Sequence, residues 1–292
     1  MAAMSLVSST AAAQDITVGQ LAPRLYVLRT TVGSNVLAVA GSGGTLLVDA
    51  GPAAGVEGLA RALDSLGVGP VRYIVNTHYH DDHTFGNAYF VRRGAVAIGH
   101  PAARVAAQVD TVIAEFNDWR RTPASADALP VLTPAGGFTI HLGSDTVRVM
   151  PAPEGHTAGD LIVHVAPADV VHMGDVYEAG AYPFIDVWAG GSIGGMVGTI
   201  RRLLAAGNPG TRYLPGHGEP GDRADLKRYL AMLTAVCEAV ARERTAGRAV
   251  EAVMDAGLTA RFDDTSWGPA RHGRIFAGIV FRSLERGSRC PP

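Results

Sequence analysis

Short blocks of hydrophobic residues, several with polar residues at alternate positions, fall into two groups along the chain. In each block β-branched and aromatic residues favour a strand, and Gly, Ser, Pro or Asp residues follow at its end. The first group predicts strands over residues 24–30, 35–41, 45–51, 71–77 and 95–100, and the second over residues 137–143, 145–152, 161–167, 169–175 and 211–216. Each group has enough strands to form a sheet of its own.

Elsewhere, hydrophobic residues recur at intervals of three and four, which predicts amphipathic helices. We expect helices over Val56–Leu66, 102–120, about 193–206 and about 223–244, and one near the C-terminus. The apolar stripes of the second and the last of these are Val105, Val109, Val112, Ile113 and Phe116, and Ile275, Phe276, Ile279, Val280 and Leu284. Two strand-rich halves, each closed by helices, predict two packed sheets with helices outside. No linker separates the halves, so we expect one domain over residues 19–292.

The composition is that of a globular enzyme rather than a nucleic-acid or membrane protein. The 292 residues include 25 basic and 27 acidic side chains, a formal charge of −2, and 47% of them are hydrophobic. This charge balance creates no electrostatic field that would attract nucleic acid. The sequence has no run of the about 18 apolar residues that are needed to span a bilayer. We therefore expect a small-molecule substrate, no nucleic-acid partner and no membrane span; the oligomeric state stays open.

The first 18 residues differ from the rest of the chain. The stretch LVSSTAAAQD, with small residues at Ala11 and Ala13, is typical of the end of a secretory signal, although a charged start and a full apolar segment are missing. A disordered tail is the alternative. We expect export to the periplasm or the medium, with the cytoplasm as the alternative, because Cys237 and Cys290 show no spacing that would decide the compartment.

A cluster of metal-binding side chains follows one of the predicted buried strands. The sequence THYHDDH places His78, His80, Asp82 and His83 close together. Residues two apart on an extended segment face the same way, so His78 and His80 can reach one ion together. If the backbone leaves the strand at Asp81, then Asp82 and His83 face elsewhere, which suggests a second ion.

Three further residues at strand ends can complete two metal sites. A catalytic zinc ion usually takes three protein ligands and leaves one position for water. His156 in APEGHTAGD and His217 in YLPGHGEP lie in Gly- and Pro-rich loops, and Asp175 ends an apolar strand, where a carboxylate is costly to bury without a counter-charge. A single loop histidine is more often a surface group, but beside the cluster these residues predict two ions bridged by Asp175.

The four motifs THYHDDH, GHTAGD, MGDV and PGHG, in this order, resemble the metallo-β-lactamase superfamily, from about residue 19 to residue 286. The resemblance implies an α/β fold, a four-layer αββα sandwich with the metals at one edge of its two sheets. It assigns His78, His80 and His156 to the first zinc ion, Asp82, His83 and His217 to the second, and Asp175 to the bridge. Asp49, in LLVDAG, matches a family position near the metal, where a carboxylate that is not itself a ligand can orient the ligands. The alternative is that the Asp49 carboxylate only stabilises a turn.

The chemistry that this resemblance implies is hydrolysis. Zinc lowers the pKa of a bound water from about 15.7 to about 7, so a metal-bound hydroxide can attack a carbonyl without a serine or cysteine nucleophile. Asp82 could orient this hydroxide and relay its proton, whereas Asp81 is expected to be a solvated neighbour. We expect two Zn²⁺ ions, with iron or manganese as alternatives. An iron oxidoreductase of the same superfamily is an alternative. Its diiron members typically carry Glu where this chain has His80, which argues against them, whereas a mononuclear iron-dependent dioxygenase stays open.

The substrate is expected to depend on residues 176–195, which leave the metal-bearing strand. Candidate substrate contacts in this loop are Tyr177, Tyr182, Phe184, Ile185 and Trp188; packing within the loop is an equal alternative for each. Several β-lactamases of the superfamily hold the carboxylate of the drug with a Lys in this region. Here Glu178 occupies that place, and no Lys or Arg occurs before Arg201.

These features leave several substrates open. We expect a cyclic amide or ester, with β-lactams the first class to test and weak activity on them, because the loop from Thr31 to Asn35 is too short for a long flap. A lactonase or a thioesterase of the glyoxalase II kind is the alternative, since Asp175 replaces the Cys ligand of one lactamase group. A non-catalytic zinc-binding protein is a third hypothesis, disfavoured by a ligand set that leaves room for water.

Overall fold

The computed structural model describes residues 16–291, apart from 31–32, 115–117, 167 and 264–269. The first sheet has the strand order β1 to β6, with strands at Thr17–Ala22, Leu25–Arg29, Asn35–Gly41, Gly44–Val48, Val71–Val75 and Val96–Ile98. Strands β1 to β4 form an antiparallel meander. Strands β4, β5 and β6 run parallel because helices connect them, among them α1 (Val56–Leu66) and α3 (Asn87–Val91).

The second sheet is formed by the second predicted group of strands, in the order β13, β12, β11, β10, β9. Its strands are β9 (Phe138–Leu142), β10 (Asp145–Ala152), β11 (Asp160–Ala166), β12 (Val170–His172) and β13 (Arg212–Leu214). Neighbouring strands pair antiparallel except β12 and β13, which run parallel because α5 (Ile193–Ala206) connects them. Every predicted strand range overlaps a strand of the structure.

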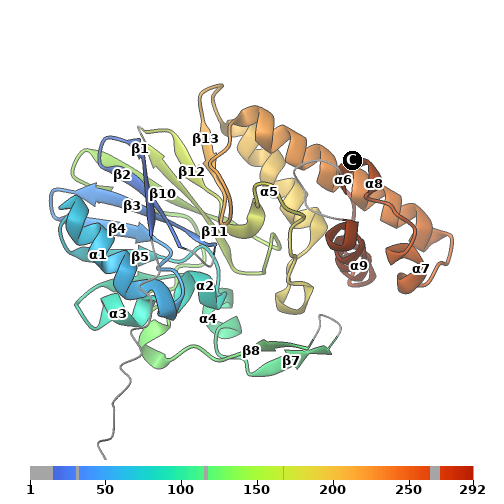
Figure 1. Ribbon diagram of the computed structural model, residues 1–292, viewed down its shortest axis with the longest axis horizontal. Helices are drawn as coiled ribbons and strands as arrows, with labels where there is room; N and C mark the ends of the chain where they lie inside the picture. Colours follow the sequence, from blue (N-terminus) through green and yellow to red (C-terminus); the bar gives the residue numbers. More distant parts are fainter. Residues whose placement is uncertain (1–15, 31–32, 115–117, 167, 264–269, 292) are drawn as a thin grey trace, which may run out of the picture.

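The two sheets pack face to face with helices on both outer faces, which confirms the four-layer αββα sandwich (Figure 1). Between the sheets lie buried side chains such as Leu46 of β4 and Leu161 of β11. On the outer face of the first sheet, Leu59 of α1 packs in one cluster with Leu47 and Ile74. The strand ends that carry the predicted metal ligands therefore come from both sheets, at one edge of the sandwich.

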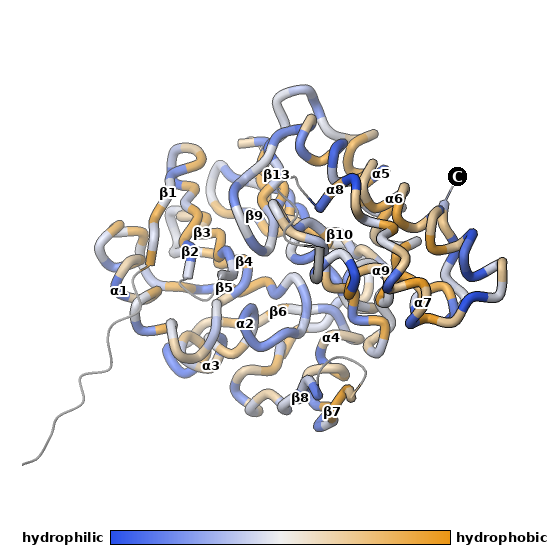
Figure 2. The backbone as a smooth tube through the Cα atoms, turned by 45° about the vertical axis from the view of Figure 1, so that its right-hand side comes forward, coloured by the Kyte–Doolittle hydropathy of each residue, from blue (hydrophilic) through white to orange (hydrophobic). Residues whose placement is uncertain are grey.

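Helices α5, α6 (Arg223–Thr245) and α9 (Ala270–Glu285) cover the outer face of the second sheet. Along α6 and α9 the backbone tube alternates between hydrophobic and hydrophilic residues, as expected for helices with one buried face (Figure 2). The predicted apolar face of α9 is buried at Phe276, Ile279, Val280 and Leu284, whereas Ile275 is 40% exposed. Shorter helices are α2 (Asp81–Thr84), α7 (Val250–Met254) and α8 (Ala260–Asp263).

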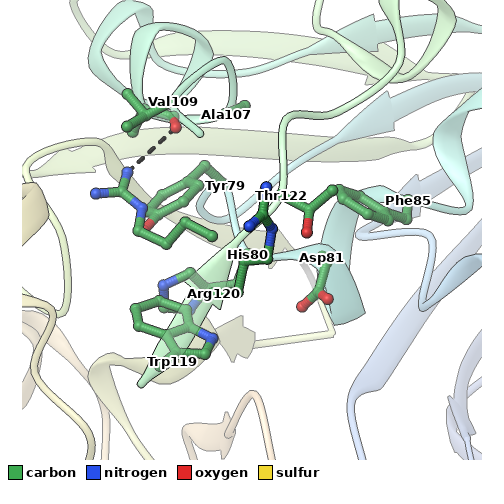
Figure 3. A pocket seen from close by; sticks show the side chains of 11 residues that line it. Tyr79, His80, Asp81, Phe85, Ala107, Val109, Trp119, Arg120 and Thr122 are labelled. Carbon is green, nitrogen blue, oxygen red and sulfur yellow. Dashed lines mark hydrogen bonds between the residues drawn. The ribbon is translucent and has the colours of Figure 1, made fainter. Parts of the chain in front are cut away.

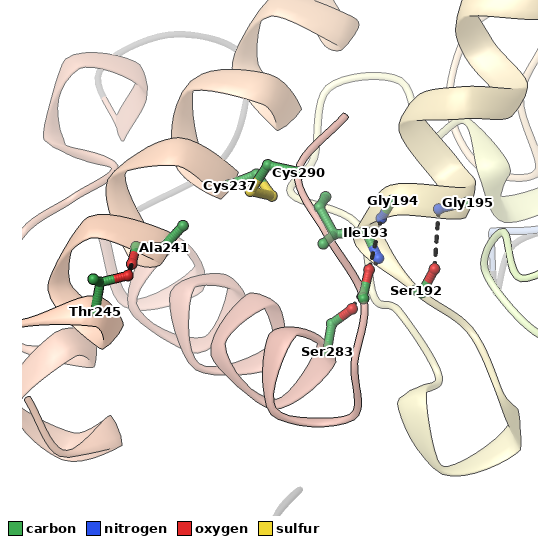
Figure 4. Close-up of a disulfide and its surroundings, with 10 residues drawn as sticks. Ser192, Ile193, Gly194, Gly195, Cys237, Ala241, Thr245, Ser283 and Cys290 are labelled. Carbon is green, nitrogen blue, oxygen red and sulfur yellow. Dashed lines mark hydrogen bonds between the residues drawn. A yellow bond between two sulfur atoms is a disulfide. The ribbon is translucent and has the colours of Figure 1, made fainter. Parts of the chain in front are cut away.

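A disulfide ties the C-terminal segment to this helical layer. It joins Cys237 of α6 to Cys290, which follows α9, over a sequence separation of 53 residues (Figure 4). Nearby, the hydroxyl of Ser283 accepts a hydrogen bond from the backbone N–H of Ile193 at the start of α5 (3.0 Å). This bond could not be predicted from the sequence, because two distant cysteines carry no spacing pattern.

The helix predicted over 102–120 is wrong beyond its first turns. The structure has α4 (Pro101–Ala106) followed by a hairpin of β7 (Thr111–Ile113) and β8 (Trp119–Arg121). Of the predicted stripe, Val105, Val109 and Val112 are exposed, Ile113 is buried and Phe116 lies outside the described residues. All three residues of β7 are β-branched, and strand pairing with β8 outweighs a helical period in the sequence.

The N-terminal boundary also differs from the prediction. Strand β1 begins at Thr17, inside the segment 1–18 that the sequence assigns to a tail, while residues 1–15 lie outside the described part of the chain. No helix in the described part of the chain is both long and apolar enough to cross a bilayer.

Candidate metal centre

The seven predicted metal ligands lie together where loops after β5, β10, β12 and β13 meet at one edge of the sandwich. They form two adjacent groups. Cluster 1 consists of His78, His80, His156 and Asp175, and cluster 2 of Asp82, His83 and His217. Within each cluster the potential ligand atoms all lie within 4.8 Å of one another.

Cluster 1 has the spacing of ligands around a single ion. His80 Nδ1 lies 3.0 Å from His156 Nε2, and Asp175 Oδ2 lies 3.7 Å from both His78 Nε2 and His156 Nε2. A tetrahedral ion with bonds of about 2.0–2.1 Å separates its ligands by about 3.3 Å. All four side chains of this cluster are buried.

Cluster 2 is equally tight but more open to water. Asp82 Oδ2 lies 3.4 Å from His83 Nε2 and 3.2 Å from His217 Nε2, and the two imidazole nitrogens are 3.4 Å apart. The side chains of Asp82 and His217 are 28% and 31% exposed. Asp175 also reaches this cluster, with Oδ1 3.2 Å from His83 Nε2 and Oδ2 3.5 Å from His217 Nε2. One carboxylate thus lies between both groups.

Asp49 orients two of the histidines from behind. Its carboxylate accepts hydrogen bonds from His83 Nδ1 (2.8 Å) and from the Thr77 hydroxyl (2.7 Å), and that hydroxyl lies 3.1 Å from His78 Nδ1. With both Nδ1 atoms engaged, His78 and His83 present Nε2 to the clusters. Asp49 holds a φ of +63°, which is rare outside glycine and is tolerated here at the end of β4.

The loop after β12 orients the other two histidines of cluster 1. Asp186 Oδ2 accepts hydrogen bonds from His80 Nε2 (3.2 Å) and from the Tyr79 hydroxyl. The backbone carbonyl of Phe184 accepts one from His156 Nδ1 (2.8 Å). His80 therefore presents Nδ1 and His156 presents Nε2. Asp186 was not among the predicted site residues, although an acidic residue inside the apolar stretch PFIDVW was a usable signal.

Gly216 allows the PGHG loop to approach the bridging carboxylate. A Cβ at Gly216 would collide with Asp175 Oδ1 and with the backbone of Gly174. The backbone N–H of Gly216 instead donates to the Gly174 carbonyl (2.8 Å). This close approach brings His217 beside Asp175.

The two clusters differ in protonation. Burial lowers the pKa of His156 to about 4 and holds the pKa of His78 well below its usual value. These imidazoles are neutral at pH 7, with lone pairs directed into cluster 1.

In cluster 2, neighbouring carboxylates outweigh burial. Although burial opposes charge, Asp175 and Asp82 raise the pKa of His217 to about 10. Burial likewise opposes charge on His83, but Asp82, Asp175 and Asp49 raise its pKa well above the usual value. Without a metal, this cluster is a set of ion pairs.

The donor set fits bound metal ions. His78 Nε2 is buried and makes no hydrogen bond in the described structure. Asp175 Oδ1 is also buried without a hydrogen bond, although it lies within ion-pair distance of His83 Nε2 (3.2 Å). Leaving a group such as His78 Nε2 unpaired costs about 1–3 kcal/mol, which coordination would offset. Imidazole and carboxylate donors in groups of three and four suit zinc, and also iron or manganese. Among the described residues, no other group of His, Cys, Asp and Glu has this spacing.

The five candidate substrate contacts separate into two sets. Tyr177, Tyr182 and Ile185 are buried in the core beneath helices α5, α6 and α9. This position favours a packing role over substrate contact for these three residues. Phe184 and Trp188 are only partly buried. The ring centre of Phe184 lies 6.0 Å from that of His80 and 5.9 Å from that of His156. Substrate contact stays a prediction for Phe184 and Trp188.

Trp119 of β8 lies beside Phe184 and His80, and it was not among the predicted site residues because a helix was expected over this segment. Its ring centre lies 5.3 Å from those of His80 and Phe184. Figure 3 shows Trp119 and His80 side by side at a small pocket. The hairpin therefore brings an aromatic side chain beside cluster 1.

Comparisons with known proteins agree with this geometry. The family model of the metallo-beta-lactamase superfamily matches residues 29–230. Among solved structures, a metallo-beta-lactamase from Pontibacter korlensis is 21% identical, with a TM-score of 0.61 over 75% of this chain and 99% of that chain. A metallo-beta-lactamase with a HARLDQ motif from Cronobacter sakazakii is 22% identical, with a TM-score of 0.61 over 81% of this chain and 97% of that one. A search of curated proteins found no match.

Proposed function

Because the chain belongs to the metallo-β-lactamase superfamily, we propose that it is a dinuclear zinc hydrolase that opens a cyclic amide or ester. The observation that carries the proposal is the pair of adjacent clusters with Asp175 between them. With Asp175 shared, three histidines in one cluster, and two histidines with a carboxylate in the other, would give each ion four protein ligands, and water or substrate would bind as a fifth ligand, a coordination number that zinc can adopt.

The ligand side chains would hold the two ions, and other residues would orient these ligands. Zinc ions bound there would supply Lewis acidity for a carbonyl and would lower the pKa of a coordinated water to about 7. Asp82 lies at the open side, and His83 and His217 lower the pKa of its carboxyl although burial opposes this. Asp82 is thus ionised at neutral pH and can orient a water molecule and accept its proton.

We propose β-lactams as the first substrate class to test, with weak activity expected. Glu178 is not placed to attract a substrate carboxylate: its side chain accepts a hydrogen bond from the backbone N–H of Phe184 (3.1 Å). Burial raises the pKa of Glu178 to about 8, so it carries little charge at pH 7. With Asp175 as the bridge, a lactone or a thioester is the alternative substrate.

Hydrolysis by the metal-loaded protein tests this proposal. A chromogenic cephalosporin, a lactone and a thioester should separate the three substrate classes, and metal analysis should find two zinc ions per chain. Turnover that persists after complete removal of metal would contradict a metal-dependent mechanism. Iron with oxygen uptake would indicate the dioxygenase, and two zinc ions without hydrolysis of any member of a broad panel would indicate a zinc-binding protein.

We also propose that the protein is exported. The disulfide between Cys237 and Cys290 supports this, because disulfides persist in oxidising compartments and are rare in the cytoplasm. Fractionation of the producing cells tests it. Recovery of the protein only in the cytoplasmic fraction, with both thiols free, would contradict export.

A further inference from the structure

The β7–β8 hairpin carries a buried cation beside the metal centre. Arg121, the last residue of β8, is only 7% exposed. Its terminal nitrogen donates to the Ala106 carbonyl (3.1 Å), and its guanidinium lies 4.8 Å over the centre of the Tyr79 ring. Its Nε–H is buried and makes no hydrogen bond with the described residues. Nor does any carboxylate in the described part of the chain form an ion pair with it.

Arg121 lines the small pocket shown in Figure 3, together with Tyr79, His80, Trp119 and Thr122. The free volume of the pocket is about 20 Å³. This is enough for one group of the size of a water molecule or a carboxylate oxygen. Because His80 belongs to cluster 1 and also lines the pocket, the pocket is adjacent to the metal centre.

Among the described residues Arg121 has no ion-pair partner, although the Tyr79 ring beneath it is bonded to Asp186. A buried guanidinium that lacks a counter-charge costs several kcal/mol. Arg120 pairs with Asp110 (2.8 Å), and both side chains are more than half exposed. Asp81 lines the pocket but is exposed to water, and Asp186 is already engaged by the metal-site histidine. An anion on Arg121 Nε would satisfy the one buried donor that remains.

The wall next to this cation is aromatic. The Trp119 ring lies beside His80 and packs edge-on against Phe184, and Phe184 in turn stacks with Trp188. Aromatic side chains of this kind give an apolar face for a ring. A guanidinium and an aromatic face side by side suit a molecule with an aromatic group and a carboxylate.

We propose that the β7–β8 hairpin recognises the substrate, with Arg121 binding a carboxylate and Trp119 packing against an aromatic or apolar group. This inference rests on the proposed function and names its substrate class: aromatic carboxylates that also carry a hydrolysable carbonyl. The hairpin thereby supplies the cation that is missing from residues 176–200.

Calorimetric titration of the metal-loaded full chain with phenylacetate and with phenylacetamide tests this proposal. We expect wild type to prefer the acid, and R121M to bind the acid about tenfold more weakly or worse while binding the amide unchanged. R92M is the matched control, since Arg92 is exposed, pairs with Asp127 (2.8 Å) and does not line the pocket, and it should leave both affinities within twofold. W119A should weaken both ligands to a similar extent.

Several outcomes would overturn the proposal. A carboxylate bound by the metals alone would keep its affinity in R121M. Equal binding of acid and amide by wild type, or no binding of phenylacetate at millimolar concentration, would exclude the site. If R121M does not fold, R121K decides: it should lose part of the preference for the acid, and an unchanged preference excludes a role for Nε. Phenylacetate needs no hydrolysis to bind, so this result and the hydrolysis panel fail independently.

Discussion

The two metal clusters share Asp175 yet differ in burial and in charge. Cluster 1 is enclosed, and burial keeps His78 and His156 neutral. Cluster 2 is partly open, and carboxylates keep His83 and His217 protonated when no metal is bound. The first cluster is prepared for a cation, whereas the second must release protons to accept one.

This difference arises from what lies behind each histidine. His80 and His156 are held by Asp186 and by a backbone carbonyl, both on the loop after β12. In cluster 2, Asp49 bonds to Nδ1 of His83, and the carboxylates of Asp82 and Asp175 face its Nε2. We therefore expect cluster 1 to fill first and cluster 2 to depend on pH.

Removing the shared carboxylate should have the largest effect. In Asp175→Ala we expect loss of metal from both clusters and a fall in kcat/KM of about 10³-fold or more, about 4 kcal/mol of transition-state stabilisation. Metal content and kinetics on the best panel substrate measure this. Asp169→Ala is the control, since this carboxylate pairs with His164 outside the centre (3.0 Å). Two ions retained in Asp175→Ala would show that Asp175 is not a bridge.

Acidification should weaken the metal at cluster 2 far more than the metal at cluster 1. With a pKa of about 10, His217 is protonated at pH 7 without metal, so binding must displace that proton. The proton of His217 alone should make the zinc affinity of cluster 2 fall by about tenfold for each pH unit below about 10, or about 100-fold between pH 8 and pH 6, and the proton that His83 must also release makes the fall steeper. His156, with a pKa of about 4, is already neutral over this range. Zinc titrations against a competing chelator give both constants, and equal pH slopes would contradict the comparison.

The carboxylates that orient the histidines, Asp186 and Asp49, should also affect the two clusters differently, with smaller losses of metal affinity than in Asp175→Ala. Asp186→Asn should weaken binding of the ion at cluster 1 by about 10- to 100-fold, because His80 is the candidate ligand that Asp186 orients and no candidate ligand of cluster 2 bonds to Asp186 in the described structure. Asp49→Asn should weaken both ions, since it supports His83 directly and His78 through a threonine. The two dissociation constants of each variant check this. Asp145→Asn, in a partly exposed pair with Arg24, is the control. A loss of zinc affinity at cluster 2 in Asp186→Asn would contradict the assignment of Asp186 to cluster 1 alone.

The clustering of the candidate ligands could be predicted because their chemistry is local in sequence. THYHDDH and the loop histidines follow strands whose hydrophobic pattern is plain, so both the sheets and the edge where they end could be predicted. The supporting residues could not, because Asp186 reaches His80 across more than a hundred positions. The hairpin that carries Trp119 and Arg121 could not be predicted, because its hydrophobic residues recur with a helical period. In the structure, β-branched residues and the pairing of β7 with β8 favour strands instead.

The smallest effect on either cluster should come from the disulfide, which lies in the helical layer. Replacing Cys237 and Cys290 by Ser should lower the free energy of unfolding by about 2–4 kcal/mol, because the bond closes a long loop in the unfolded chain. Both zinc affinities should stay unchanged, since neither cysteine touches a ligand or a residue that orients one. Chemical denaturation of the metal-loaded double variant, with zinc titration alongside, measures both quantities. If one cluster lost affinity and the other did not, the difference between them would depend on the helical layer as well as on the groups behind each histidine.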